Sequence, residues 1–287
     1  MQALFGQLLI GLINGAFYAM LSLGLAVIFG LLNIINFTHG AQYMMGAFCA
    51  WFLLNKAGVG YWWALLFAPI VVGAIGMLIE RTMLARLYKL DHLYGLLLTF
   101  GLALIIQGLF RNEFGSSGLP YQIPSELTGG MNLGFMFLPI YRAWVIVASL
   151  VVCFSTWYVI ERTKLGSYLR AATENPTLVQ AFGVNVPRMI TLTFGFGVGL
   201  AALAGVMAAP IYQVNPLMGA DMIIVVFAVV VIGGMGSIMG AIVTGFGLGV
   251  IEGLTKVFFP EASNTVIFII MAIVLLIRPA GLFGTQK

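Results

Sequence analysis

Charged residues are scarce in this chain of 287 residues, and that scarcity decides the class of protein. Only 8% of the residues are Asp, Glu, Lys or Arg, and residues 1–55 contain none of them. A soluble domain is about 25% charged, so the composition excludes a soluble globular enzyme. It also excludes a disordered chain, because disordered chains combine low hydrophobicity with high charge.

Cysteine, histidine and the motifs of catalysis are also scarce or missing. The sequence has two cysteines (Cys49 and Cys153) and two histidines (His39 and His92), too few for a disulfide framework or a zinc site. It contains no Gly-x-Ser-x-Gly, no His-Glu-x-x-His and no Gly-x-x-x-x-Gly-Lys-Ser/Thr motif. We therefore expect no catalytic residue, no metal site and no bound cofactor in this chain. If ATP drives its function, another polypeptide must bind the nucleotide.

Apolar residues dominate what is present. They make up 61% of the chain, and the mean hydropathy is +1.07. Because a membrane-spanning helix needs about 20 apolar residues, this supply covers eight or nine spans. The apolar runs are continuous, which excludes the alternating strands of a transmembrane β-barrel. We expect a single all-α, polytopic membrane domain over residues 1–287, with the first span retained because no basic segment of a signal peptide precedes it.

Stretches without charge place the expected spans. Residues 1–55 hold two spans, and a long helix is expected over roughly 189–213. One span each fits the runs 57–79, 92–110, 143–160 and 262–277. The run 222–251 is interrupted by glycines, and we interpret it as two short spans or as one broken helix with a re-entrant piece. A membrane tolerates such a break where the backbone packs against protein or lines a cavity.

Lysine and arginine set the expected orientation. The loops at 80–92 and 161–188 and the C-terminus together hold nine of the 13 Lys and Arg residues, and the positive-inside rule places them in the cytoplasm. The outer loop at 112–141 is rich in Gly and Pro. In the inner loop, Asn175 is a good helix N-cap and Pro176 a good first helical residue. We therefore expect two short helices in the inner loop, in a form suited to docking another protein.

Polar residues interrupt the first apolar stretch. The interruption consists of Asn33, Asn36, Phe37, Thr38, His39 and Gly40. An unpaired polar group in hydrocarbon costs a few kcal/mol, so these side chains must hydrogen-bond or meet water. The segment is either a gate or hinge at the cytoplasmic end of a translocation path or an ordinary interfacial turn, and the residues alone are compatible with both.

Glycines form a second interruption, at Gly233, Gly234, Gly236 and Ser237. Each glycine costs a helix about 1 kcal/mol relative to Ala. We interpret the segment as a pivot or as backbone that lines the path, with plain crowding of helices as the alternative. Glycines spaced four apart at positions 11 and 15, and at 245, 249 and 253, are instead typical of close helix packing.

One carboxylate lies at the end of a long uncharged run. Glu252 directly follows the run 222–251, and an ionisable group at membrane depth is a functional candidate. The alternative, which we favour, is an interfacial ion pair with Lys256, because Glu and Lys four residues apart lie on the same face of a helix.

Several segments together resemble the permease of bacterial branched-chain amino acid ABC importers, the first of the two permease subunits in such systems. The family also includes permeases for urea, short amides and other amino acids. The segments run from one end of the chain to the other: Asn14-Gly15 to Gly24, Asn36-Phe37-x-His39-Gly40 with Gly46-Ala47, Glu80-Arg81, Arg170-Ala171-Ala172-x-x-Asn175, Gly183-Val184-Asn185-Val186, Ala204-Gly205, Gly233-Gly234-x-Gly236-Ser237-x-x-Gly240-Ala241 and Arg278-Pro279-x-Gly281-Leu282-Phe283-Gly284.

The resemblance implies a fold, a location and partners. The fold is that of a type II ABC importer permease with eight or nine transmembrane helices, some broken or re-entrant, in the bacterial inner membrane. The partners are a second homologous permease, two ATPase subunits that bind ATP and Mg²⁺, and a periplasmic solute-binding protein, with no nucleic acid. In the family the inner loop docks on the ATPase, although the signature Glu-Ala-Ala-x-x-x-Gly is stretched here. Carried onto this sequence, the coupling residues are Arg170, Ala171, Ala172, Glu174, Asn175 and Gly183.

The expected function is therefore ATP-driven import of a small neutral or zwitterionic solute, with branched-chain or related amino acids as the first expectation. The alternative is a secondary transporter or channel for a small neutral solute, such as urea or an amide, that works without ATPases. The sequence shows no convincing Asp/Glu pair at mid-membrane for ion coupling. A purely structural subunit would not need paired glycine breaks, and an intramembrane enzyme would need nucleophile and base residues that are missing.

Overall fold

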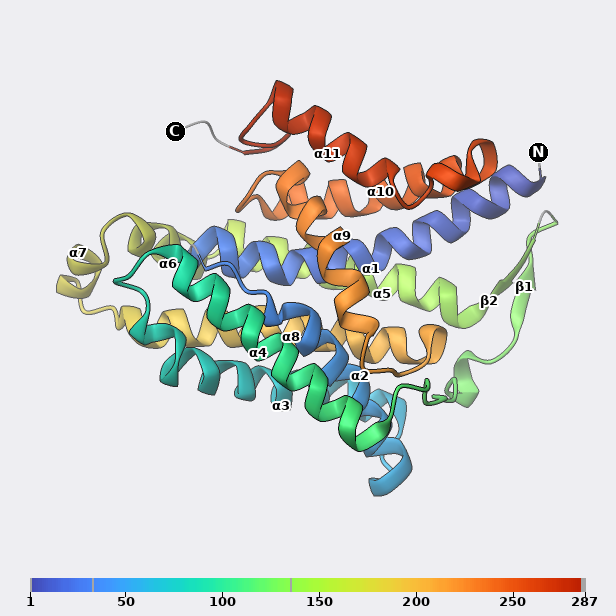
Figure 1. Ribbon diagram of the computed structural model, residues 1–287, viewed down its shortest axis with the longest axis horizontal. Coiled ribbons are helices and arrows are strands. Elements are labelled where there is room, and N and C mark those ends of the chain that lie inside the picture. Colours follow the sequence, from blue (N-terminus) through green and yellow to red (C-terminus); the bar gives the residue numbers. More distant parts are fainter. Residues whose placement is uncertain (1, 33, 135, 285–287) are drawn as a thin grey trace. The chain divides into compact units, whose positions relative to one another are not determined.

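The computed structural model describes residues 2–32, 34–134 and 136–284, and most of them are helical (Figure 1). The helices are α1 (Gln2–Leu32), α2 (Thr38–Ala57), α3 (Tyr61–Thr82), α4 (His92–Phe114), α5 (Ile140–Arg162), α6 (Lys164–Glu174), α7 (Pro176–Ala181), α8 (Val186–Tyr212), α9 (Met218–Gly233), α10 (Ile238–Phe258) and α11 (Val266–Ile277). Short 3-10 turns occur at η1 (Leu84–Arg86), η2 (Ser125–Leu127) and η3 (Pro260–Ala262), and β1 (Gly130–Asn132) pairs with β2 (Phe137–Pro139) in an antiparallel hairpin.

Six of the described helices are long and apolar enough to cross a membrane: α1, α3, α4, α5, α8 and α10. At 1.5 Å per residue, a core about 30 Å thick requires about 20 residues. The apolar helices α9 and α11 have 16 and 12 residues and fall short of that length. The multi-pass helical fold is therefore confirmed, whereas the count of eight or nine spans stays a prediction.

Helix boundaries follow the sequence signals closely. The helix expected over 189–213 is α8 at Val186–Tyr212, and the expected break in the run 222–251 separates α9 from α10. The loop at 161–188 contains two short helices, α6 and α7, as expected. Asn175 caps α7 by accepting a hydrogen bond from the backbone N–H of Leu178 at 3.0 Å, and Pro176 occupies the first turn.

The chain forms two compact units, each assembled from separate segments. The first unit comprises Met1–Leu23, Gln122–Phe154 and Ile224–Lys287, and the second comprises Gly24–Tyr121 and Ser155–Ile223. Each unit has its own packing, and the two are described separately below.

In the second unit, α8 packs along α2 and α3 with the helix backbones in close contact. A methyl group at Gly46 of α2 would overlap the backbone of Ala202 in α8, and one at Gly205 of α8 would overlap the carbonyl of Tyr43. Small residues thus allow the approach, as is usual for helices in lipid. The apolar core beside these contacts consists of Ile28, Ile34, Val72, Leu84, Phe194, Val198 and Ala202.

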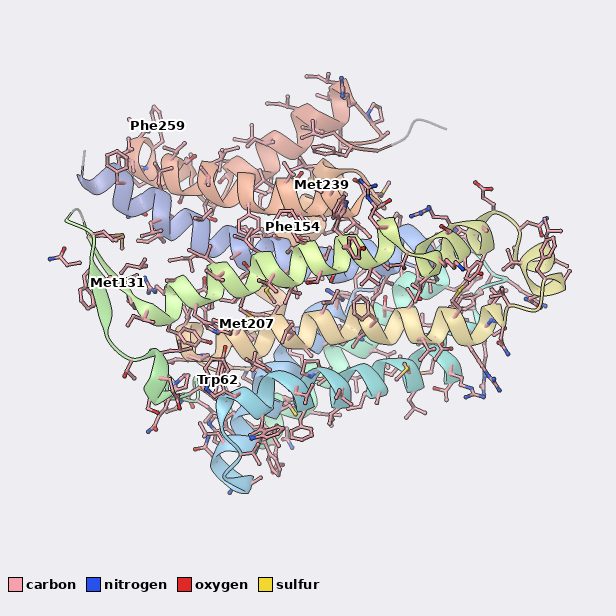
Figure 2. All side chains as sticks on the ribbon, turned by 180° about the vertical axis from the view of Figure 1, so that it is seen from behind. Trp62, Met131, Phe154, Met207, Met239 and Phe259 are labelled. Carbon is pink, nitrogen blue, oxygen red and sulfur yellow. The ribbon has the colours of Figure 1, made fainter. Side chains whose placement is uncertain are left out.

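In the first unit, the N-terminal part of α1 packs antiparallel to α10. A methyl group at Gly249 would overlap Gly11 and Gly15, and one at Gly253 would overlap the carbonyl of Gln7. The expectation that glycines spaced four apart mark helix packing is confirmed for both helices. Apolar side chains elsewhere in the chain project outward, including Trp62, Phe154 and Phe259 (Figure 2), and such exposure fits lipid rather than water as the surroundings.

Candidate functional site

At the first interruption, between α1 and α2, three buried polar side chains form a closed ring of hydrogen bonds. The amide nitrogen of Asn36 donates to Gln42 at 3.0 Å, the amide nitrogen of Gln42 donates to the hydroxyl of Thr38 at 3.1 Å, and that hydroxyl donates back to Asn36. All three side chains are at most 1% exposed. The polar groups therefore satisfy one another, which removes most of the penalty of burying them. Asn33 lies outside the described residues.

Neighbouring helices hold this interruption in place. The backbone N–H of Phe37 donates to the hydroxyl of Thr99 in α4 at 3.2 Å. A methyl group at Gly40 would overlap the carbonyl of Gly219 in α9, so the two backbones touch there. His39 is fully buried, and its ring lies close to Gly24 of α1. The predicted path residues 36–40 are thus brought together in the second unit, at a junction of α1, α2, α4 and α9.

The second interruption, between α9 and α10, is a turn that requires glycine. Gly234 and Gly236 have φ values of 102° and 95°, which L-residues with a side chain rarely adopt. Ser237 then caps α10 by accepting a hydrogen bond from the backbone N–H of Gly240 at 3.0 Å. A methyl group at Gly233 would lie 2.7 Å from the backbone of Gly240. The four predicted residues therefore form one compact backbone turn in the first unit.

The C-terminal segment, residues 278–284, packs against this turn. The backbone N–H of Leu282 donates to the carbonyl of Ile232 at 2.8 Å, and that of Phe283 donates to Gly233 at 3.1 Å. Gly281, with φ 81°, lies directly against Gly234. Sequence reasoning placed the C-terminus in the cytoplasm but did not foresee that this segment packs against the glycine turn. Gly281 and Gly284 were the available signal in the sequence, because glycine lets two backbone segments approach closely, and both lie against Gly234.

The loop at 161–188, which contains α6 and α7, is mostly exposed, and side-chain caps begin α7 and α8. Asn185 caps α8 by accepting from the backbone N–H of Arg188 at 3.1 Å, and Gly183, with φ 83°, makes the turn between α7 and α8. Arg170 donates to the carbonyl of Ile160 at 3.3 Å and forms an ion pair with Glu161 at 3.4 Å. This contact anchors α6 to the end of α5.

The other predicted coupling residues lie on the surface of this loop. Ala171, Glu174, Asn175 and Gly183 are exposed, and Ala172 is half-buried. Two exposed apolar side chains accompany them: Leu178 is 55% exposed and Phe182 is 80% exposed. Sequence reasoning missed both residues, of which Leu178 lies in α7 and Phe182 directly follows it.

A polar cluster around one buried carboxylate, Glu252, joins α1 to α10 in the first unit. Glu252 is 5% exposed, accepts a hydrogen bond from the hydroxyl of Tyr18 at 2.7 Å, and forms an ion pair with Lys256. The amide of Asn14 lies 3.5 Å from the same carboxylate. The predicted pair of Glu252 with Lys256 is confirmed. Its two partners on α1 were not foreseen, because they lie more than two hundred residues away in the sequence.

Comparison with known proteins fixes the family. Residues 7–275 match the family described as "Branched-chain amino acid transport system / permease component". The chain is 31% identical to the high-affinity branched-chain amino acid transport permease BraD of Pseudomonas aeruginosa, over 98% of this chain and 96% of BraD. This chain belongs to the branched-chain amino acid transport permease family.

Further relatives include two differently named transport permeases, LivH and LivM. The permease is 28% identical to the transport permease LivH of Escherichia coli, over 98% of this chain and 96% of LivH. It is 29% identical to the transport permease LivM of the same organism, over 94% of this chain and 68% of LivM. No solved structure matches the permease.

The ion pair of the permease's α10 yields a testable expectation. We expect Lys256→Met to lower the melting temperature more than the double variant Lys256→Met with Glu252→Gln. Losing Lys256 alone leaves a buried carboxylate without its cation, which costs about 3–5 kcal/mol in a fully buried pair. The cost is smaller here because 32% of the Lys256 side chain is exposed. A double variant that melts at or below the single variant would contradict this role for the pair.

Proposed function

We propose that the chain is the non-catalytic permease subunit of an ATP-driven importer for branched-chain or related amino acids. The observation that carries this proposal is the family match over residues 7–275, together with relatives that align over nearly their full length. The permease contributes the membrane passage and binds no cofactor itself. ATP and Mg²⁺ bind to partner ATPase subunits.

The importer is a complex in the bacterial inner membrane. Similarity to both LivH and LivM supports pairing with a second, homologous permease. Two ATPase subunits and a periplasmic solute-binding protein complete the assembly. The permease is one domain with eight or nine spans, in which α2, α9 and α11 join the six long helices. The loop at 161–188 and the C-terminus are cytoplasmic, as the distribution of Lys and Arg indicates.

Transport is driven from the inner loop. Closure of the ATPases moves α6 and α7 through an exposed surface that includes Leu178 of α7 and Phe182, which directly follows it. Rigid helices transmit that movement to the two interruptions, residues 36–40 and 233–237, which act as the gate and the pivot of the path. Because the binding protein selects the solute, the permease needs little affinity of its own. The few charges within its spans suit a zwitterionic amino acid, which carries no net charge.

Purification from native membranes tests this proposal. We expect the tagged permease, extracted in a mild detergent, to bring down a second permease and P-loop ATPase subunits, identified by mass spectrometry. In proteoliposomes, the complex with its binding protein should then accumulate leucine, isoleucine or valine only when ATP is inside. Uptake by the permease alone that is independent of ATP and collapses with an ionophore would instead establish a secondary transporter.

A further inference from the structure

One end of α3 and α8 is fixed by a buried carboxylate. Glu80, 2% exposed, accepts hydrogen bonds from the hydroxyl of Thr191 at 2.6 Å and from the hydroxyl of Tyr88. Partial burial raises the pKa of Tyr88 well above its usual range, and the hydrogen bond to Glu80 adds to this effect, so Tyr88 stays a neutral donor. These contacts tie α3, α8 and the segment after η1 into one rigid wall.

Two grooves flank α8 at this end. The larger groove, between α3 and α8, has a volume of about 750 Å³. Its apolar lining includes Ala74, Met77, Leu78 and Ile190, and Arg81 and Arg188 also line it. The smaller groove, between α8 and the α5–α6 junction, has a volume of about 430 Å³ and is lined by residues such as Ile160, Leu165 and Phe196. Both volumes far exceed the roughly 30 Å³ of one water molecule in the liquid.

The two grooves meet at the same residues. Arg188 and Leu192 line both of them, so α8 forms a ridge with an apolar hollow on each side and an exposed cation on top. Arg81 adds a second cation at the larger groove. Glu80 also lines that groove, but both of its oxygens already accept hydrogen bonds, and two arginines outweigh its single charge.

This arrangement matches the chemistry of a phospholipid. We propose that the ridge of Arg188 and Leu192 binds one anionic phospholipid of the surrounding bilayer, with the phosphate on Arg188 and Arg81 and one acyl chain in each groove. Basic residues between transmembrane helices bind anionic headgroups in this way, and a ligand with two apolar branches and one anionic junction fills both grooves at once. A folded protein partner would present one continuous surface rather than two branches. The site lies beyond the transport function and depends only on α3 and α8 lying in the membrane.

Lipid retention by the intact importer tests this site. We expect native mass spectrometry of the purified complex to detect bound phosphatidylglycerol in preference to phosphatidylcholine after exchange into mixed micelles. The double variant Arg81→Gln with Arg188→Gln should weaken that retention about tenfold or more, because both charge-assisted hydrogen bonds to the phosphate are lost. Leu192→Trp, which adds bulk to both grooves while keeping the cations, should expel the lipid as well.

The control is Arg86→Gln, since Arg86 is an exposed arginine in η1 that lines neither groove. Its retention of phosphatidylglycerol should equal that of the wild type. Retention by the double variant equal to that of the wild type would overturn the proposal.

Displacement of the lipid by soluble glycerol phosphate at millimolar concentration would also overturn it, since the acyl chains would then contribute nothing to binding. Burial of Leu192 by the second permease, seen as a cysteine cross-link from Leu192→Cys to that subunit, would overturn it too. None of these readouts depends on transport.

Discussion

We expect Gly183→Val, in the loop at 161–188, to lower sharply the amount of solute transported per ATP hydrolysed. The importer should still fold and assemble. Gly183 has φ 83°, and its backbone N–H donates to the carbonyl of Gln180 at 2.9 Å, ending α7. A left-handed conformation costs a residue with a side chain about 1–2 kcal/mol, and most for a β-branched residue. The backbone of the turn between α7 and α8 is therefore expected to adopt a different conformation, so that movement of the ATPase is no longer transmitted to α8.

The effect comes from the backbone alone, which allows a sharp control. A methyl group at Gly183 would meet no atom within 4 Å, so crowding plays no part. Gly134, in the loop between β1 and β2, has φ 81° and equally open space. Gly134→Val imposes the same strain outside the inner loop and should leave coupling intact. Gly183→Asn should also retain coupling, because Asn tolerates the left-handed region.

Uptake of labelled leucine and release of phosphate, measured on the same proteoliposomes, check this expectation. We anticipate a fall of about tenfold in solute moved per phosphate released for Gly183→Val, with ATPase activity largely retained. If Gly183→Val and Gly134→Val both transport like the wild type, the assignment of residues 161–188 to coupling is wrong. If both fail equally, the defect is general strain rather than loss of coupling.

Much of the fold could be predicted because hydrocarbon imposes simple demands. Most helix ends lie near a charged residue, a proline or a glycine, whereas α1 ends at Leu32 and α8 at Tyr212 without one directly beside them, and Pro69 and Pro210 lie inside helices. α11 is shorter than its run 262–277 suggested. The 3-10 turn of Pro260–Ala262 and its continuation delay the start to Val266, and Pro279 disfavours helix at Arg278. Composition thus predicts which stretch can form a helix, but the exact first and last residues of the helix depend on local backbone geometry.

The polar pairings at the site could not be predicted in the same way. The sequence showed that Asn36 and Thr38 needed partners, and Glu252 to Lys256 was visible because helical geometry fixes neighbours four apart. Thr99, which accepts from Phe37, lies 62 residues away, and Tyr18 lies 234 residues from Glu252. Which distant helix supplies a partner depends on tertiary packing. The sequence therefore shows which buried side chains need a hydrogen-bond partner, whereas the tertiary fold determines which residue is that partner.

Glycine at position 249 should be far less replaceable than glycine two residues earlier. Both lie in α10, and replacing either with Ala gains about 1 kcal/mol of helix propensity. A methyl group at Gly249 would overlap the backbone of Gly11 and Gly15 in α1, whereas one at Gly247 would meet no atom within 4 Å. The difference between the two variants therefore isolates the packing of α1 on α10 from every effect of glycine on the helix itself.

We expect Gly249→Ala to destabilise the permease and Gly247→Ala to leave its stability equal or slightly higher. Overpacking costs about 1–3 kcal/mol, and the obstacle here is backbone, which cannot rotate away as a side chain can. With about 2–4 °C per kcal/mol for chains of 150–250 residues, the melting temperatures should differ by several degrees. Thermal unfolding in one detergent, followed by size-exclusion chromatography, measures that difference. Equal melting temperatures would mean that α1 and α10 do not pack through these glycines, and the glycine spacing would then have to be explained by a partner outside this chain.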